Sequence, residues 1–303
     1  MKIVFFGTSA GTLTKKRGLS AIGLKEKGSK EWILFDSGEA TQIQILKSNW
    51  SISKLKYIFI THLHGDHIYG LFGLIASRGL LQIKTPLNIY GPKGIKKLIE
   101  CVVDITSLHP SFELNITEIQ NGDRFEAGEL TIESVKLSHS IESFGFVVDL
   151  KRVHKNLDVE KLKSLGVMPS RLYGKLKREK ELEVDGKKIK LSEVERVKVE
   201  SKRVIVGGDN DKPELFLRFK GVDLMIHEST YTQKDFENLL KQQKHTTSKQ
   251  LAIVASKMGV KKLVLTHISP RYDEGKEDKL IKEAKEFFKG EVILAKDFLE
   301  IEL

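Results

Sequence analysis

Residues 61–71 read THLHGDHIYGL and place three histidines and one aspartate within six positions. His62 and His64 are two residues apart, so on an extended segment their side chains point to the same side. Asp66 and His67 are adjacent and cannot easily face one point. Imidazoles and carboxylates are common ligands of zinc and manganese. The spacing therefore suggests two metal ions, with His62 and His64 on one and Asp66 and His67 on the other.

Two metal ions need further ligands, and three candidates follow other apolar runs. His139 comes after ESVKLS, Asp209 after RVIVGG, and His267 after KLVLT. Each of them alone also fits a cap or a core residue. Together they complete two triads and one bridging carboxylate: His62, His64 and His139; Asp66, His67 and His267; and Asp209. Such a set leaves positions open for a shared water, as hydrolytic metal sites require.

The bulk composition bounds the class of protein. The 303 residues are enough for one large α/β domain or two small ones. The single cysteine, Cys101, excludes intramolecular disulfides and Cys-rich zinc sites, and its apolar helical surroundings predict that it is buried. No apolar run approaches the roughly 18 residues of a membrane span. The opening MKIVFFG reads as a first strand and not as a signal, so we expect a soluble cytoplasmic protein without a membrane partner.

Apolar patterning predicts a strand-rich α/β chain. Helical spacing is found at 41–48, 69–78, 94–108, 247–258 and 277–288, and strand-like runs lie between these segments. The last run, VILAKDFLEIEL, reads as one strand over 292–303. Because strands outnumber helices near both ends of the chain, two facing sheets with helices outside fit better than a strictly alternating pattern.

The positive charge is concentrated in one segment. Residues 151–203 carry 17 Lys or Arg and 9 Asp or Glu, a net charge of +8, whereas the whole chain carries +10. Lysine-rich segments are usually only solvated surface. An excess confined to one segment is better explained by a polyanionic partner.

The motif HLHGDH resembles the signature of the metallo-β-lactamase superfamily, and the segments around it resemble the ribonuclease Z family of tRNA 3′-processing endonucleases. The similar segments are FFGTSAG with DSGE (36–39), SHSIESFGFVV, VIVGGDND, HEST (227–230), HTTSKQLA (245–252) and LTHISPRY. Asn210 stands where threonine is commoner in the family. The resemblance implies an αββα sandwich of two facing mixed sheets with helices outside, formed by 1–150 and 203–303. It also implies a protruding basic arm at 151–202.

For function, the resemblance implies a zinc-dependent endoribonuclease that removes the 3′ trailer from precursor tRNA. A water activated by two metal ions would attack phosphorus, leaving a 3′-hydroxyl on the tRNA and a 5′-phosphate on the trailer. Two Zn²⁺ per subunit are expected, with Mn²⁺ as the alternative, in a homodimer. Asp66 would be the general base and also a metal ligand.

The resemblance also assigns roles outside the metal ligands. His245 would supply a proton to the departing 3′ oxygen, and Glu228 would orient it. From the residues alone, a helix cap at His245 and a surface pair at His227 and Glu228 fit equally well. Asp36 would support the ligand histidines from behind. The arm residues expected to hold tRNA phosphates are Lys175, Lys177 and Arg178.

Two other functions remain open at this point. A hydrolase of small phosphodiesters or esters would keep the same ligands but would have no use for a basic arm. An RNA-binding scaffold with a degenerate site is disfavoured because no expected ligand is missing.

Overall fold

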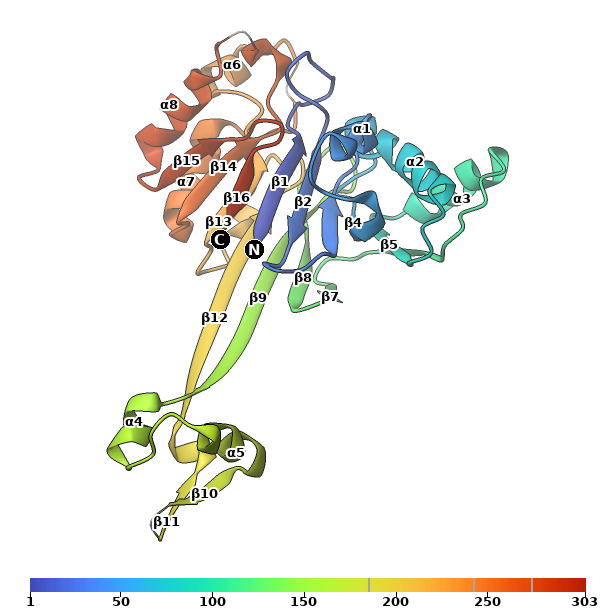
Figure 1. The fold of residues 1–303 in the computed structure, drawn as a ribbon. Helices are drawn as coiled ribbons and strands as arrows, with labels where there is room; N and C mark the ends of the chain where they lie inside the picture. The colour runs from blue at the N-terminus through green and yellow to red at the C-terminus, as the bar shows by residue number, and fades with distance from the viewer. Residues whose placement is uncertain (185, 242, 274) are drawn as a thin grey trace. The chain divides into compact units, whose positions relative to one another are not determined.

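The computed structural model describes residues 1–184, 186–241, 243–273 and 275–303. The chain divides into two compact units, which are described separately here (Figure 1). The larger unit contains Met1–Asp149 and Lys202–Leu303, and the smaller contains Leu150–Ser201. Among the described residues, no helix is both long enough and apolar enough to cross a membrane.

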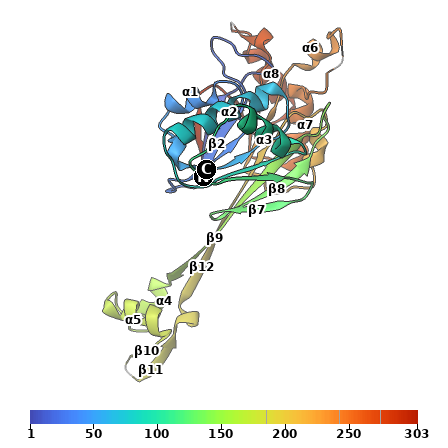
Figure 2. The ribbon, with the colours of Figure 1, turned by 90° about the vertical axis from the view of Figure 1, so that its right-hand side faces the viewer.

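The first sheet of the larger unit has the strand order β16-β1-β2-β3-β4-β5-β6. Its strands are β1 (Lys2–Gly7), β2 (Ala21–Lys25), β3 (Trp32–Phe35), β4 (Leu55–Phe59), β5 (Leu87–Gly91), β6 (Leu114–Glu118) and β16 (Glu300–Glu302). Strands β3 to β6 are parallel, and β1 is antiparallel to both β2 and β16. The helices on its outer side are α1 (Thr41–Leu46), α2 (Gly65–Leu80) and α3 (Ile95–Ile105) (Figures 1 and 2).

The second sheet has the order β15-β14-β13-β12-β9-β8-β7. Its strands are β7 (Arg124–Ala127), β8 (Leu130–Lys136), β9 (Phe144–Leu157), β12 (Glu195–Val206), β13 (Leu224–Glu228), β14 (Lys262–Thr266) and β15 (Glu291–Leu294). Strands β12 to β15 are parallel, whereas β7 and β8 are antiparallel. The helices on this side are α6 (Gln233–Glu237), α7 (Ser248–Met258) and α8 (Asp278–Phe287).

Aromatic side chains pack where the two sheets face each other. Phe146 of β9 lies 5.5 Å from Phe35 of β3 and 5.2 Å from Phe59 of β4 between ring centroids. Each sheet thus buries one face against the other and one against helices, because both faces of its parallel strands are apolar. The expected sandwich of two mixed sheets with helices outside is confirmed.

The smaller unit has its own apolar core. Its elements are α4 (Val159–Ser164), α5 (Arg171–Glu179), β10 (Glu181–Val184) and β11 (Lys187–Lys190), the last two paired antiparallel. The buried residues are Leu162, Val167, Leu176, Leu182, Ile189 and Val194. These apolar residues are spaced among charged ones, so the sequence shows no apolar run at this core. Short 3₁₀ helices across the chain are Ile52–Lys54, Leu191–Glu193, Pro213–Phe216 and Pro270–Tyr272.

Two expectations from the sequence are wrong. The run 292–303 forms two strands in different sheets, because the chain turns between β15 and β16, where Phe298 has a φ of 65°. Cys101 is exposed and not buried. The buried face of α3 carries Ile95 and Ile99, and a residue two positions after Ile99 cannot share that face of a helix.

Candidate metal centre

The HLHGDH segment spans the turn between a strand and a helix. Strand β4 ends at Phe59, and α2 begins at Gly65 with His64 as its extended N-cap residue. His62 therefore lies in the extended connection, whereas Asp66 and His67 belong to the first helical turn. A carboxylate in the first turn is favoured by the positive end of the helix dipole.

The loop after β3 holds this turn in place. Gly38 packs so closely that a Cβ on it would lie 2.4 Å from the carbonyl oxygen of Asp66, so no larger residue fits. The Ser37 N–H donates to the carbonyl of His67 at 2.8 Å, and the Gly70 N–H donates to the carbonyl of Ser37 at 2.9 Å. The loop after β3 thus fixes the start of α2, and with it the side chains of Asp66 and His67 in the first helical turn.

One triad of ring nitrogens forms around His64. Its Nδ1 lies 3.0 Å from Nε2 of His62 and 3.3 Å from Nε2 of His139. A potential ligand atom of each of the three residues lies within 4.8 Å of the others. His139 comes from the loop after β8, so the triad joins the two sheets.

A second triad lies beside it. Nε2 of His267 is 3.4 Å from Nε2 of His67 and 3.3 Å from Oδ2 of Asp66, and the same Asp66 oxygen is 3.6 Å from His67 Nε2. His267 follows β14 with a φ of 54°, which is a strained conformation for a residue with a side chain. The surrounding packing must hold it there.

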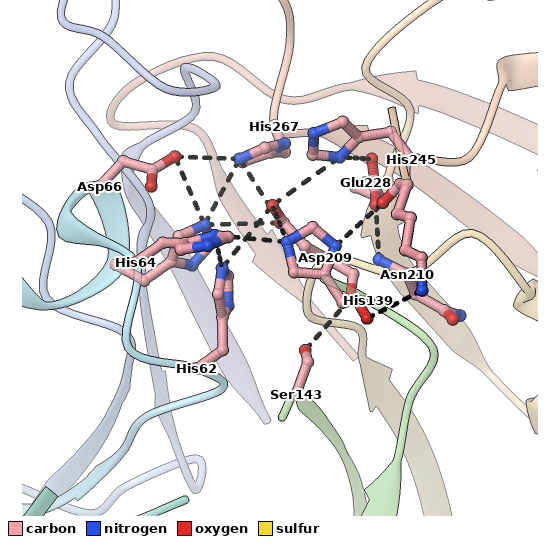
Figure 3. A network of polar contacts seen from close by, with 12 residues as sticks. His62, His64, Asp66, His139, Ser143, Asp209, Asn210, Glu228, His245 and His267 are labelled. Carbon is pink, nitrogen blue, oxygen red and sulfur yellow. Dashed lines mark hydrogen bonds and ion pairs between the residues drawn. The ribbon is translucent and has the colours of Figure 1, made fainter. Parts of the chain in front are cut away.

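Asp209 lies between the triads, with one oxygen toward each (Figure 3). Its Oδ1 is 3.4 Å from Nε2 of both His67 and His267. Its Oδ2 is 3.8 Å from His62 Nε2 and 3.9 Å from His139 Nε2. Asp209 therefore faces both groups of potential ligand atoms.

The spacing of these atoms fits metal ligands. Zinc ligands at about 2.0–2.1 Å from a tetrahedral ion are separated from one another by about 3.3 Å. The contacts of His64 with His62 and His139, and those among Asp66, His67 and His267, run from 3.0 to 3.6 Å. In addition, several ring nitrogens that carry lone pairs face each other, which a shared cation satisfies better than a hydrogen bond between two such nitrogens. The donor set of imidazoles and carboxylates suits zinc or manganese.

The ring nitrogens on the outer side of the triads have hydrogen-bond partners, as metal-binding histidines usually do. Nδ1 of His67 is 2.7 Å from Oδ2 of Asp36, and Nδ1 of His62 is 3.0 Å from Oγ1 of Thr61. The remaining contacts are His139 Nδ1 to the Lys244 carbonyl at 2.9 Å and His267 Nδ1 to Thr230 Oγ1 at 3.1 Å.

Asp36 is the main support behind the cluster. It also accepts hydrogen bonds from the N–H and the hydroxyl of Thr61, at 2.7 and 3.0 Å. Its φ of 60° aims the carboxylate at His67. Asp36 therefore contacts the candidate ligand His67 directly, and it contacts the Thr61 hydroxyl that lies beside Nδ1 of His62.

The ionisation of the cluster follows from its crowding. Burial and the nearby His67 lower the pKa of His62. Burial also acts to lower the pKa of His67, but the carboxylates of Asp209 and Asp36 raise it to about 10. Burial acts to raise the pKa of Asp66, but hydrogen bonding to His267 and the charge of His67 lower it. A cation entering the cluster would therefore displace a proton from His67.

Glu228 and His245 form a second group beside Asp209. Glu228 is 1% exposed at the end of β13, and its Oε2 is 3.0 Å from Nδ1 of His245. The same oxygen accepts the Thr230 hydroxyl at 2.6 Å, and Oε1 accepts the Asn210 N–H at 2.6 Å. His227 is also fully buried. The alternative of a surface pair at His227 and Glu228 is therefore wrong.

His245 does not cap the helix that follows it. The cap of α7 is Thr247, whose side chain accepts the Gln250 N–H while the Gln250 side chain accepts the Thr247 N–H. Although burial opposes it, the carboxylate of Glu228 raises the pKa of His245 to about 9. Despite its burial, the carboxyl of Glu228 has a pKa lowered to about 2, first by the charge of His245. The pair is therefore an ionised carboxylate and an imidazolium around neutral pH.

An open cleft of about 630 Å³ gives access to the candidate ligands and to His245. Its lining includes His64, Asp66, His139, Asp209, His245 and His267. His62 and His67 are fully buried beneath it. The cleft is large enough for a nucleotide-sized group to reach the triads.

The predicted arm residues lie in the smaller unit, on α5. Lys175, Lys177 and Arg178 are exposed, whereas Leu176 between them is buried in the small core. Nζ of Lys175 lies 3.8 Å from Oε2 of Glu179. Because this ion pair is exposed, it contributes little to stability.

Several groups in this region were not predicted from the sequence. They are the Thr61 and Thr230 hydroxyls, the Lys244 carbonyl, and the Gly11 N–H, which donates to Asp66 Oδ2 at 2.8 Å. Backbone groups leave no trace in residue identity, so only the threonines were open to inference: Thr61 precedes the predicted ligand His62, and Thr230 belongs to the HEST segment. Tyr272, in the LTHISPRY segment, is buried and packs in the core.

Comparisons with known proteins agree with this architecture. Residues 31–156 match the family model described as a β-lactamase superfamily domain. Ribonuclease Z of Bacillus licheniformis is 39% identical over 307 residues, covering 100% of this chain and 99% of the relative. Ribonuclease Z of Bacillus cereus is 40% identical over 293 residues, covering 95% of each. The crystal structure of human tRNase Z, short form, is 26% identical, with a TM-score of 0.68 and coverage of 100% and 99%.

Proposed function

The chain belongs to the ribonuclease Z family and is an endoribonuclease, and we propose that it removes the 3′ trailer from precursor tRNA. Cleavage would leave a 3′-hydroxyl on the tRNA and a 5′-phosphate on the trailer. The observation that supports this most is the pair of triads with Asp209 between them, together with His245, which lines the same cleft and contacts the buried Glu228. Such a site offers cation binding, a base and an acid at one phosphodiester.

The proposed metal content is two Zn²⁺ per subunit, with Mn²⁺ as the alternative. His62, His64 and His139 would hold one ion and Asp66, His67 and His267 the other, with Asp209 shared. The ions would supply Lewis acidity, lowering the pKa of a water molecule and offsetting the charge of the scissile phosphate.

Asp66 is the proposed general base. The Gly11 N–H and Nε2 of His267 both contact Oδ2 of Asp66, which leaves Oδ1 for the proton of the attacking water. Its lowered pKa means that the carboxyl is ionised at neutral pH, which is the form that can accept a proton, but the same shift makes it a weak base.

His245 is the proposed acid, and Glu228 is its positioning residue. Because Nδ1 faces Glu228, Nε2 is the nitrogen available to the departing 3′ oxygen. The carboxylate of Glu228 raises the pKa of His245, which favours the protonated ring that an acid requires. Donating that proton would prevent a free alkoxide from forming on the tRNA.

The smaller unit is the proposed tRNA-binding arm, inserted between 1–150 and 203–303. Lys175, Lys177 and Arg178 would contact phosphates of the tRNA body and recognise its shape more than its sequence. The homodimer and the cytoplasmic location remain predictions from the sequence.

The test is cleavage of an end-labelled precursor tRNA with a 3′ trailer, with Zn²⁺ or Mn²⁺ and then with chelator. A small chromogenic phosphodiester is assayed in parallel. One metal-dependent cut at the trailer junction supports the proposal. Turnover of the small diester without any cut in the precursor would favour a hydrolase of small phosphodiesters or esters instead.

A further inference from the structure

Lys244 brings a positive charge to the wall of the catalytic cleft. Among the described residues that line this cleft, it is the only lysine or arginine. The other charged side chains there include the carboxylates of Asp66 and Asp209, which would be neutralised by bound cations. An RNA strand in the cleft carries a phosphate on each side of the scissile one. A further positive charge in the cleft would favour the binding of one of these flanking phosphates.

The contacts of Lys244 fix its backbone and leave its charge available. Its carbonyl accepts a hydrogen bond from His139 Nδ1 at 2.9 Å, and its Nζ donates to the His139 carbonyl at 3.3 Å. The side chain is exposed. Within the described part of the chain, no carboxylate forms an ion pair with this ammonium group. A neutral carbonyl is a weak partner that an incoming phosphate can replace.

The position of Lys244 in the chain indicates which phosphate it reaches. It immediately precedes His245, whose Nε2 faces the departing 3′ oxygen in the proposed function. That oxygen belongs to the last nucleotide kept by the tRNA. The phosphate on the 5′ side of this nucleotide therefore lies on the same side of the cut as His245 and Lys244.

We propose that Lys244 binds the phosphate immediately 5′ of the last retained nucleotide and thereby positions the scissile bond. This inference rests on the proposed function. A lysine–phosphate contact fixes position without reading sequence. Loss of one charged hydrogen bond corresponds to about a tenfold fall in kcat/KM, and loss of one phosphate contact on a single strand lowers the salt slope by about 0.7.

The experiment is a double-mutant cycle in which one change is made in the protein and the other in the substrate. The wild-type enzyme and Lys244→Ala are each assayed on precursor tRNA with an ordinary backbone and with one uncharged methylphosphonate at that upstream position. The wild type should lose about tenfold on the modified substrate, and Lys244→Ala about tenfold on the ordinary one. The two losses should not multiply, because both remove the same contact.

Two controls keep the result specific. Lys241→Ala removes an exposed lysine three residues away that does not line the cleft, and it should behave as wild type. A methylphosphonate on the trailer side should affect wild type and Lys244→Ala by the same factor. Losses that multiply at the upstream position would overturn the assignment of Lys244. If the wild type fails to cut the ordinary precursor, the proposed function fails, and this inference fails with it.

Discussion

Glu228→Gln tests whether the buried carboxylate serves catalysis or only packing. In the structure, Oε1 accepts the Asn210 N–H and Oε2 accepts both the Thr230 hydroxyl and His245 Nδ1, at 2.6, 2.6 and 3.0 Å. An amide has one accepting oxygen and one donating nitrogen, so in either orientation it faces a donor with a donor. The cost of one unsatisfied buried group is about 1–3 kcal/mol.

Glu228→Gln also removes the negative charge beside His245, so cleavage should be slowed in addition to the loss of stability. A charged hydrogen bond contributes about 1.5–3 kcal/mol, so kcat should fall by about 10- to 100-fold. Without the carboxylate that raises the pKa of His245 to about 9, the ring loses its proton at lower pH. The alkaline side of the pH–rate profile should therefore move to lower pH, and the loss of activity should be greater at high pH than near pH 6.

The assay is single-turnover cleavage of precursor tRNA over a range of pH, with unfolding by urea and metal content measured on the same samples. Glu237→Gln, at an exposed position on α6, is the matched control and should change stability by less than about 0.5 kcal/mol. Wild-type kcat and an unmoved pH profile in Glu228→Gln, together with lowered stability, would show that Glu228 acts only through packing and would refute the assigned role.

Three further predictions test other parts of the molecule. Asp66→Ala should reduce cleavage by at least about 10²-fold and leave the circular dichroism spectrum unchanged, since Asp66 lies outside the apolar core; near-normal cleavage would rule it out as the base. Metal binding to chelator-treated protein at about pH 8 should release protons, because the pKa of His67 is about 10 without metal; calorimetric heats that are identical in buffers of different ionisation enthalpy would contradict this. Replacing Lys175, Lys177 and Arg178 with alanine should lower the salt slope of precursor binding by about 2 to 3 and leave hydrolysis of a small phosphodiester unchanged. Alanine at the exposed lysines 27, 30 and 47 should leave the salt slope unchanged. Equal losses of activity on both substrates would show that the arm residues are structural.

Much of the secondary structure could be predicted from local pattern. The helices α1, α3, α7 and α8 begin and end within a few residues of the expected ranges, because their apolar spacing matches a helical period. The start of α2 was missed by four residues, since Gly65, Asp66 and His67 carry no apolar pattern. The break between β15 and β16 was missed because an apolar sequence does not show which sheet each part joins.

The candidate ligands could be found from residue type and from their place after apolar runs. His62, His64, Asp66 and His67 are close in the chain, so their local spacing alone suggested two pairs. The convergence of His139, Asp209 and His267 on these pairs could only be expected, since it depends on how two sheets face each other.

The sequence by itself determined which residues are chemically suited to hold metal and where the positive charge is concentrated. Only the tertiary structure decided that His67 and His267, 200 residues apart, approach to 3.4 Å, and that Asp209 turns one oxygen to each triad. It alone decided that Glu228 is buried against His245 and that the Lys244 carbonyl holds His139. The physical reason is that side-chain chemistry is a property of each residue, whereas distance, burial and backbone hydrogen bonds are set by packing between segments remote in the chain.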